Sequence, residues 1–567
     1  MARILPGGRK FFRLLMLAGF ILTSVASNRV QASDRAPLSD APVLWYADDD
    51  KPIALPAFRE PGLVPYSLES FVSRPFSRFF HPGRLVRTFD DGYAGRRAPN
   101  VNSLDEVINS TWFTNRIGLH DLSCVEVAAG SGFADGPDRS EPWTIIGAKT
   151  AGVTPGFRIK DALGHVWLLK FDPPSHPGMT IRAGVVSNLI FHALGYNVPS
   201  DRLVVFDLED LVVGEGAVMK LPRVGEVPMT AANLDSILQS TNSVFEGHFH
   251  ALASKYLSGK PLGPFNDQGR RDDDPNDTIK HQDRRELRAL KVFASWINHF
   301  DTKMHNSLDM YVGPEGKGHV KHHLIDFAST LGAFGAEPVK RFGYEYGIDL
   351  PPMLGRSLAL GFHEDAWVGL ERPEGLHEIG LFEVEIFEPE KWKPDLPHSG
   401  MANLTEADGY WAAKVLSGFT VEHIRTMVDE AHYQNPHASD YLVQTLRGRQ
   451  EKIVRYWFNQ VPPLDFFQVG TNVVRYKDLG VTRGFISGDG VLYRHRLAAV
   501  NAGREAKQWT QWSESSATEI LLSGAPETNS DHRFLAVQCQ VNRGQGWSST
   551  TTAYLATTFS TVVAVER

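Results

Sequence analysis

Alternating apolar and polar positions predict a group of strands in the first third of the chain. Runs rich in Val, Ile, Leu and aromatic residues cover 143–146, 157–160, 165–171, 203–206 and 216–221. Apolar residues spaced three and four apart predict a helix over 185–194, which ends at Gly195. We expect these elements to form one sheet-bearing lobe over 141–260.

Helical periodicity dominates the part that follows. The predicted helices cover 278–299, 408–416, 421–431 and 441–458. After the first of them, two apolar runs flank the Gly- and Pro-containing stretch 313–318, which predicts a hairpin. We expect a second, mainly helical lobe over 261–463.

The two flanks of these lobes have a different character. Residues 33–140 are rich in Pro, Gly and Asp with few periodic runs, so they predict an irregular segment that wraps a core. Residues 464–567 carry short Val-, Thr- and aromatic-rich runs between Gly, Ser and Asn turns, which predict a β-sandwich. The expected fold class is therefore α+β, with two lobes, an N-terminal wrap and a C-terminal all-β domain.

The first 32 residues have the pattern of an export signal. A basic start precedes an apolar run over 14–25 and the small-residue site Val30-Gln31-Ala32. We expect an exported protein, periplasmic or extracellular, with no membrane span after the signal is removed; an uncleaved anchor is the alternative. Removal changes the net charge from −8 to −13, because this segment carries five Lys and Arg and no acidic residue. An acidic surface argues against nucleic acid as a partner.

The densest chemical signal is a polar motif that follows the predicted helix over 278–299. His299, Asp301, Lys303 and Asn306 are spaced as His-x-Asp-x-Lys-x-x-Asn, and the predicted hairpin then leads to Asp326 in Asp-Phe-Ala. This order resembles the catalytic loop and metal-binding Asp of protein kinases, with Ala where Gly is usual. The resemblance is to the protein-kinase superfamily, in its atypical HipA- and CotH-type branches, over about 145–460.

The resemblance implies a role for each residue in phosphoryl transfer, which depends on positioning and on cancelling negative charge. Asp301 would accept or orient the proton of the acceptor hydroxyl, Lys303 would contact the transferring group, and His299 would be the structural His of the loop. Asn306 and Asp326 would bind the metal of ATP with Mg or Mn. In the first lobe, Lys170 would hold the α- and β-phosphates, and a turn that contains Gly152 and Gly156 would cover them.

One departure divides two functional hypotheses. The helix after Lys170 should carry a Glu as its partner, but Gly184, Ser187 and Asn188 occupy the plausible positions. The intact Asp301, Asn306 and Asp326 favour an exported ATP-dependent phosphotransferase that acts on a protein or small molecule. The missing Glu favours a pseudokinase or binding protein without catalytic activity.

Other polar groups allow further hypotheses. A metal-dependent hydrolase would need a His site drawn from His281, His299, His305, His322 and His323, whose spacing forms no familiar metal motif. The acidic segment 270–277 also resembles a segment of a group of exported bacterial proteins, which adds no function. It predicts a solvated, salt-bridged loop, with calcium binding or substrate contact as alternatives. Cys124 and Cys539 are either unpaired thiols or a disulfide that export permits.

Overall fold

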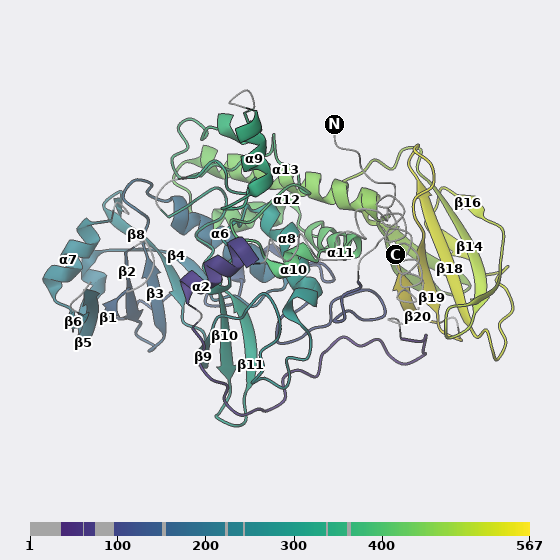
Figure 1. The fold of residues 1–567 in the computed structure, drawn as a ribbon, viewed down its shortest axis with the longest axis horizontal. Helices are drawn as coiled ribbons and strands as arrows, with labels where there is room; N and C mark the ends of the chain where they lie inside the picture. The colour runs from purple at the N-terminus through teal and green to yellow at the C-terminus, as the bar shows by residue number, and fades with distance from the viewer. Residues whose placement is uncertain are drawn as a thin grey trace, which may run out of the picture.

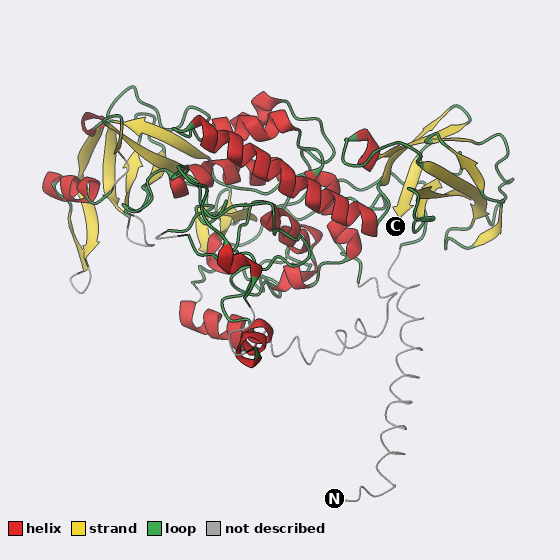
Figure 2. Cartoon of the chain, turned by 90° about the horizontal axis from the view of Figure 1, so that it is seen from above, coloured by secondary structure: helices red, strands yellow, loops and turns green. Residues whose placement is uncertain are grey.

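A computed structural model shows three parts in a row: a sheet-bearing lobe, a helical lobe and a β-sandwich (Figure 1). Viewed from above, strands lie at both ends and helices cross the centre (Figure 2). The α+β fold class predicted from the sequence is confirmed. The structure describes residues 36–60, 62–73, 96–149, 155–221, 225–241, 244–335, 338–359, 364–558 and 560–567. The expected export signal and Gly152 lie outside these residues.

The first lobe is built on an eight-stranded sheet with the order β4-β8-β3-β2-β1-β5-β6, in which β7 pairs with β8. Its strands are β1 (Trp143–Ala148), β2 (Gly156–Lys160), β3 (Val166–Lys170), β4 (Asp201–Phe206), β5 (Leu211–Leu221), β6 (Gly225–Pro228), β7 (Val244–Phe245) and β8 (His248–Lys255). Neighbours are antiparallel except β1 and β5. The five predicted strands all belong to this sheet.

Helix α6 (Met179–Leu194) joins the first lobe to the second. Every residue in it except His192 is buried, because the sheet covers one side and helices cover the other. Its apolar side chains share a core with those of α8, among them Phe293 and Trp296. The short helix α7 (Ala231–Gln239) lies at the far end of the sheet (Figure 1).

The second lobe contains the predicted helices with shifted ends. They are α8 (Arg285–Trp296), α11 (Glu406–Leu416), α12 (Val421–Asp429) and α13 (Pro436–Gln460), and the short helix α10 (Ser399–Ala402) is present in addition to the predicted ones. The first helix is shorter than predicted, because His281–Asp283 forms a 3₁₀ turn (η3) and Arg284 is extended. Among the described residues, none of the helices has both the length and the apolar character that a membrane crossing requires.

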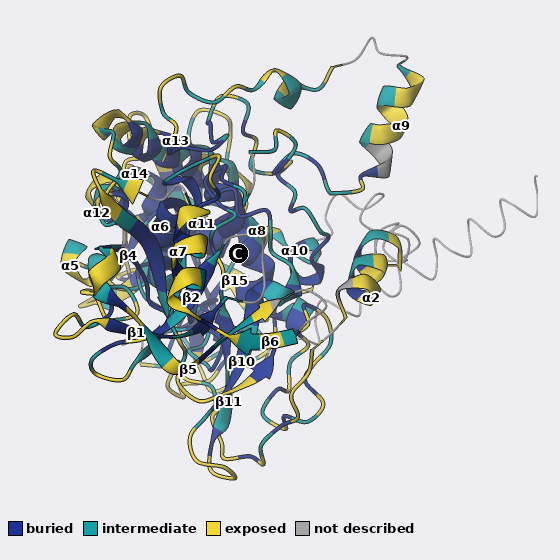
Figure 3. Cartoon of the chain, turned by 90° about the vertical axis from the view of Figure 1, so that its left-hand side faces the viewer, coloured by how far each residue is buried: buried dark blue, intermediate teal, exposed yellow. Residues whose placement is uncertain are grey.

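The predicted hairpin is present as β10 (Ser307–Val312) and β11 (His319–Leu324), with β9 (Lys260–Gly263) as a third strand. The described residues from Asp326 to His398 are irregular apart from α9 (Leu350–Leu358) and the 3₁₀ turn η5 (Ala366–Gly369). Figure 3 shows α9 standing away from the body with much of its surface exposed. The lobe is therefore less helical than the sequence predicts.

The N-terminal segment contacts all three parts of the molecule. Backbone bonds join Leu38 to the sandwich at Ala502, and Ile53 to the β10–β11 turn at Gly318. It contains the short elements α2 (Leu63–Leu68), η1 (Glu69–Ser73) and α5 (Cys124–Ala129). A buried ion pair also holds this segment against α8, since the Arg285 guanidinium lies 2.9 Å from the Asp105 carboxylate.

The C-terminal part packs two antiparallel sheets against each other. One has the order β12-β13-β17 and the other β15-β14-β18-β19-β20, with β16 beside β14. The elements are β12 (Leu464–Gly470), β13 (Val473–Asp478), α14 (Leu479–Thr482), β14 (Leu492–Val500), β15 (Ala506–Trp509), β16 (Ser513–Ser515), β17 (Glu519–Leu521), β18 (Phe534–Asn542), β19 (Thr551–Leu555) and β20 (Val562–Glu566). Apolar residues of both sheets form one core. Cys539 is buried in this core and Cys124 lies on α5, and both thiols are unpaired.

Candidate functional site

An ion pair between the two lobes marks the candidate site. Lys170 ends β3 in the sheet, and Asp326 follows β11 in the helical lobe. The Lys170 ammonium donates a hydrogen bond of 3.1 Å to Oδ1 of Asp326. The Lys170 side chain is 16% exposed and the Asp326 side chain 48%, so the carboxylate can be reached from solvent while the lysine is largely enclosed.

The charges at this contact stabilise each other in their ionised forms. Burial alone would lower the pKa of Lys170, but Asp326 and Asp201 raise it above its usual value. Burial alone would raise the pKa of Asp326, but Lys170, together with Lys149 and Lys303, holds it below its usual value. The carboxylate is therefore available as an anion at neutral pH.

The motif residues 299–306 lie on a loop that is held by its own polar groups. The Lys303 ammonium lies 2.8 Å from Oδ2 of Asp301. The Asn306 amide nitrogen donates to the Asp301 carbonyl at 2.6 Å, which leaves the amide oxygen as the atom able to bind a cation. His299 is buried against Phe191 and Phe327, and burial lowers its pKa, so it belongs to the packing beneath the loop.

Asp326 is fixed beside this loop by backbone and ring contacts. The Ile325 amide donates a hydrogen bond to the Asn306 carbonyl at 3.0 Å. The two residues expected to bind the metal, Asn306 and Asp326, therefore lie on neighbouring segments of the chain. Asp326 has a φ of 62°, a left-handed conformation that is uncommon outside glycine and is often found at functional sites. Phe327 stacks on Phe191 of α6 with ring centroids 5.0 Å apart, which anchors the segment to the helix.

Gly156 has a structural reason to be glycine. A Cβ atom there would lie 2.1 Å from the Leu169 carbonyl oxygen, so β2 can approach β3 only without a side chain at this position. The other glycine of the predicted phosphate turn, Gly152, falls outside the described residues. The structure thus places Gly156 opposite Lys170 in the sheet, and its close packing explains the residue type without a ligand.

The positions on α6 where a Glu was expected are used for packing instead. A Cβ atom at Gly184 would lie 2.7 Å from the Leu252 side chain. The Ser187 hydroxyl is 2.7 Å from that of Thr330, and the Asn188 amide donates to the Pro199 carbonyl at 2.9 Å. Helix α6 therefore fits too tightly against its neighbours to carry a glutamate toward Lys170.

Sequence reasoning missed two charged residues beside Lys170. Lys149 follows β1, and its amide donates to the Gly156 carbonyl at 2.9 Å. Its Cδ atom lies 3.3 Å from the position that a Cβ atom on Gly156 would occupy. Burial and the nearby Lys170 lower the pKa of Lys149 to about 8. The second missed residue is Asp201 at the start of β4, which is buried. The sequence feature that could have indicated Asp201 is an acidic residue at the start of an apolar strand.

The histidines considered for a hydrolytic metal site are engaged elsewhere. His322 lies 2.6 Å from Asp309 and stacks on Trp112, and His281 lies 2.7 Å from Asp277. Across the part of the chain that the structure describes, no three or more His, Cys, Asp or Glu residues form a group suited to a metal ion.

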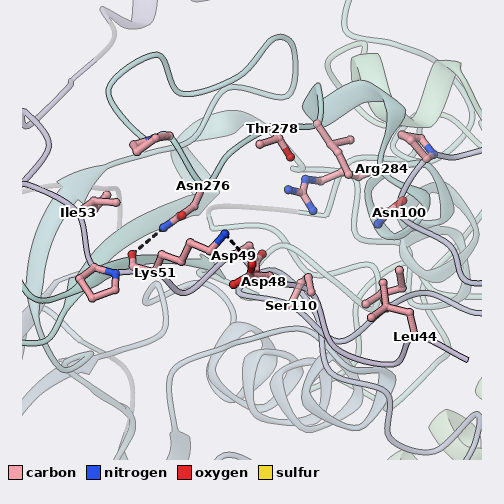
Figure 4. A pocket seen from close by; sticks show the side chains of 16 residues that line it. Leu44, Asp48, Asp49, Lys51, Ile53, Asn100, Ser110, Asn276, Thr278 and Arg284 are labelled. Atoms are coloured by element: carbon pink, nitrogen blue, oxygen red, sulfur yellow. Dashed lines mark hydrogen bonds and ion pairs between the residues drawn. The ribbon is translucent and has the colours of Figure 1, made fainter. Parts of the chain in front are cut away.

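The acidic segment 270–277 is salt-bridged as predicted, but much of it is buried rather than solvated. Arg271 pairs with Asp309 at 3.1 Å, and the N-terminal segment covers the loop through the Asn276 amide, which donates to the Lys51 carbonyl at 2.8 Å. A cavity of about 480 Å³ separates the two segments, with the Arg284 side chain on one side (Figure 4). Neither Lys170 nor Asp326 lines this cavity, so it is separate from the candidate site.

Comparisons with known proteins add little to this geometry. A scan against protein-family models finds no match, and a search of curated proteins finds none either. Among solved structures, this chain is similar to the crystal structure of a Helicobacter pylori proinflammatory kinase CtkA. The two share 10% sequence identity with a TM-score of 0.28, over 53% of this chain and 92% of that one. At this TM-score the similarity supports neither an activity nor a ligand for the chain.

Proposed function

We propose that this chain is an exported, kinase-like phosphotransferase that uses ATP to phosphorylate a protein or a small molecule. The observation that carries the proposal is the Lys170–Asp326 ion pair, which links the sheet to the loop that holds Asp301 and Asn306. The Asp326 carboxylate, which is suited to bind a cation, then lies beside Lys170, and Asp301 lies on the loop that contacts the segment before Asp326. That combination serves phosphoryl transfer, in which positioning and charge cancellation supply most of the catalysis.

The donor atoms suit a hard divalent cation. Asp326 offers a half-exposed carboxylate and Asn306 an amide oxygen, both of which are ligand types preferred by Mg²⁺ and Mn²⁺. When bound, the metal would neutralise charge on the phosphates of ATP. Lys170 and Lys149 would hold the phosphate oxygens from the sheet side, where the Lys149 side chain passes beside Gly156 and Lys170 is paired with Gly156 across the sheet.

Asp301 is the residue placed to act on the acceptor. Its side chain is 20% exposed, and Lys303 holds one of its oxygens at 2.8 Å. The carboxylate would take the proton of the acceptor hydroxyl as the oxygen attacks phosphorus, while Lys303 would stabilise the negative charge that develops nearby.

A transfer assay tests the proposal. The full chain is incubated with terminally labelled ATP and Mg²⁺ or Mn²⁺, alone and with generic acceptor proteins, and labelled product is measured. We expect metal-dependent labelling that Lys170→Met removes and that Lys260→Met, an exposed lysine on β9, leaves unchanged. Equal labelling by both variants would exclude the Lys170–Asp326 site as its source.

The affinity for ATP is expected to fall as the pH rises above about 8. Lys149 has a pKa lowered to about 8, so it carries its charge below that pH and loses it above. The pKa of Lys170 is raised, so that group stays charged. The dissociation constant for ATP should be roughly tenfold larger at pH 9.5 than at pH 7.5, which corresponds to the loss of one charged contact.

Lys149→Arg provides the matched control for this pH dependence, because arginine keeps its charge throughout the range. Its affinity should be nearly flat with pH. An equally steep pH dependence in the arginine variant would mean that a group other than Lys149 titrates.

A pseudokinase is the second candidate, and a specific contact favours it. Lys303 already neutralises Asp301 at 2.8 Å, and α6 has no acidic residue along Met179–Leu194. Such a protein would bind Mg·ATP and show no transfer to any acceptor. Binding without labelling, in the assay above, would select this candidate.

A further inference from the structure

The carboxylate of Asp201 is buried in the sheet on the side that faces the second lobe. Asp201 is 3% exposed, and its Oδ1 atom has no hydrogen-bond partner among the described residues. The Ser254 hydroxyl stabilises the ionised form. Burying a carboxylate with so few hydrogen-bond partners is costly unless a positive charge lies nearby. The question for Asp201 is which positive charge offsets this cost.

Sheet register places Asp201 and Lys170 on the same face. Strand β8 lies between β3 and β4, and its residue Ser254 is opposite Leu168 on one side and Asp201 on the other. Side chains alternate along a strand, so Lys170, two residues after Leu168, projects from the same face as Asp201. This is the face that α6 covers, because Leu252 belongs to the core that includes α6.

Electrostatics agree with this placement. Burial raises the pKa of Asp201 to about 6, although the Lys170 charge opposes that rise. In the other direction, Asp201 helps Asp326 to raise the pKa of Lys170. Lys170 therefore pairs with the half-exposed carboxylate of Asp326 on the opposite lobe and shares one face of its own sheet with the buried carboxylate of Asp201.

We propose that Asp201 is the positioning residue that holds Lys170 in place of the absent helix glutamate, while Asp326 turns to the metal of the nucleotide. The inference rests on the proposed nucleotide site and names a component of it. It also gives Lys170 a partner within its own lobe, which a pair formed only with Asp326 of the second lobe would not give.

The first test measures Lys170 directly and needs no nucleotide. The side-chain pKa of Lys170 is followed by NMR of ¹³C-methylated lysines, with Lys170→Arg to identify its signal. In Asp326→Asn, the Asp201 carboxylate should still oppose the effect of burial on this pKa. In the double variant with Asp201→Asn, burial without a carboxylate should lower the pKa below that of the single variant. The same pKa in the single and double variants would overturn the proposal.

The second test separates this inference from the proposed function. Mg·ATP affinity is compared among wild type, Asp201→Asn, Asp201→Ser and Asp235→Asn, an exposed carboxylate on α7. Both Asp201 variants should bind about tenfold more weakly, the control should match wild type, and circular dichroism should show all four folded. Unchanged affinity in a folded Asp201 variant would overturn the proposal. If wild type binds no nucleotide, the proposed function fails, and the NMR experiment still decides whether Asp201 holds Lys170.

Discussion

Asp326→Asn is expected to weaken Mg·ATP binding by at least about 100-fold. In the Lys170–Asp326 ion pair, the Asp326 carboxylate is the group that solvent can reach. It lies near Asn306, because the Ile325 amide donates a hydrogen bond to the Asn306 carbonyl. Replacing it removes the anionic metal ligand. Changes to groups that merely support a metal ligand already cost about 10- to 100-fold in affinity, so loss of the ligand itself should cost at least the upper value.

The binding of Mg·ATP to this variant is measured by titration calorimetry. Asp272→Asn is the matched control, because Asp272 is an exposed carboxylate in the same lobe. Binding by the control at wild-type strength, with none by Asp326→Asn, assigns the site. Equal binding by the two variants would mean that the metal and the nucleotide are held elsewhere.

Asp301→Asn is expected to separate transfer from binding. Asparagine keeps the size of the side chain and its contact with the loop, but it cannot accept a proton. Loss of a positioned general base typically lowers the rate about 10²- to 10⁴-fold. The rate of phosphate transfer should therefore fall by this factor, while the dissociation constant of Mg·ATP stays within about twofold, since Asp301 is not among the residues proposed to hold the metal or the phosphates.

Initial rates of label transfer, measured with saturating Mg·ATP, test this expectation. Asp272→Asn should again match wild type. A wild-type rate in Asp301→Asn would exclude Asp301 as the base, and a parallel loss of nucleotide affinity would show that the substitution disturbs the loop as a whole. Neither result would affect the assignment of Asp326.

The sequence predicted the fold class because the patterns along the chain are local. The strands around β3 and the helix α6 follow from alternation and helical spacing, and the C-terminal sandwich follows from short β-rich runs. The long irregular stretch from Asp326 to His398 was harder to foresee, because it has no regular spacing to interpret and its position depends on packing against distant parts of the chain.

The sequence indicated only part of the candidate site, because the other part depends on contacts between distant segments. Asp301, Asn306 and Asp326 lie close along the chain, so spacing could indicate them. Lys149 and Asp201 come near Lys170 only through strand register, which places residues from separate strands on one face of a sheet. The sequence also predicted a solvated loop over 270–277, whereas Arg271, Asp274 and Asp277 of this loop are buried and Asn276 contacts Lys51 of the N-terminal segment.

The most direct test of the central claim is a thermal unfolding experiment on the wild-type chain with and without Mg·ATP. If Lys170, Asn306 and Asp326 form a metal–nucleotide site, ligand at 100 times its dissociation constant should add about 2.7 kcal/mol to the free energy of unfolding. Asp326→Asn should show no such gain under the same conditions. A wild-type protein whose unfolding is unchanged by Mg·ATP or Mn·ATP at millimolar concentration would contradict both the phosphotransferase and the pseudokinase hypotheses.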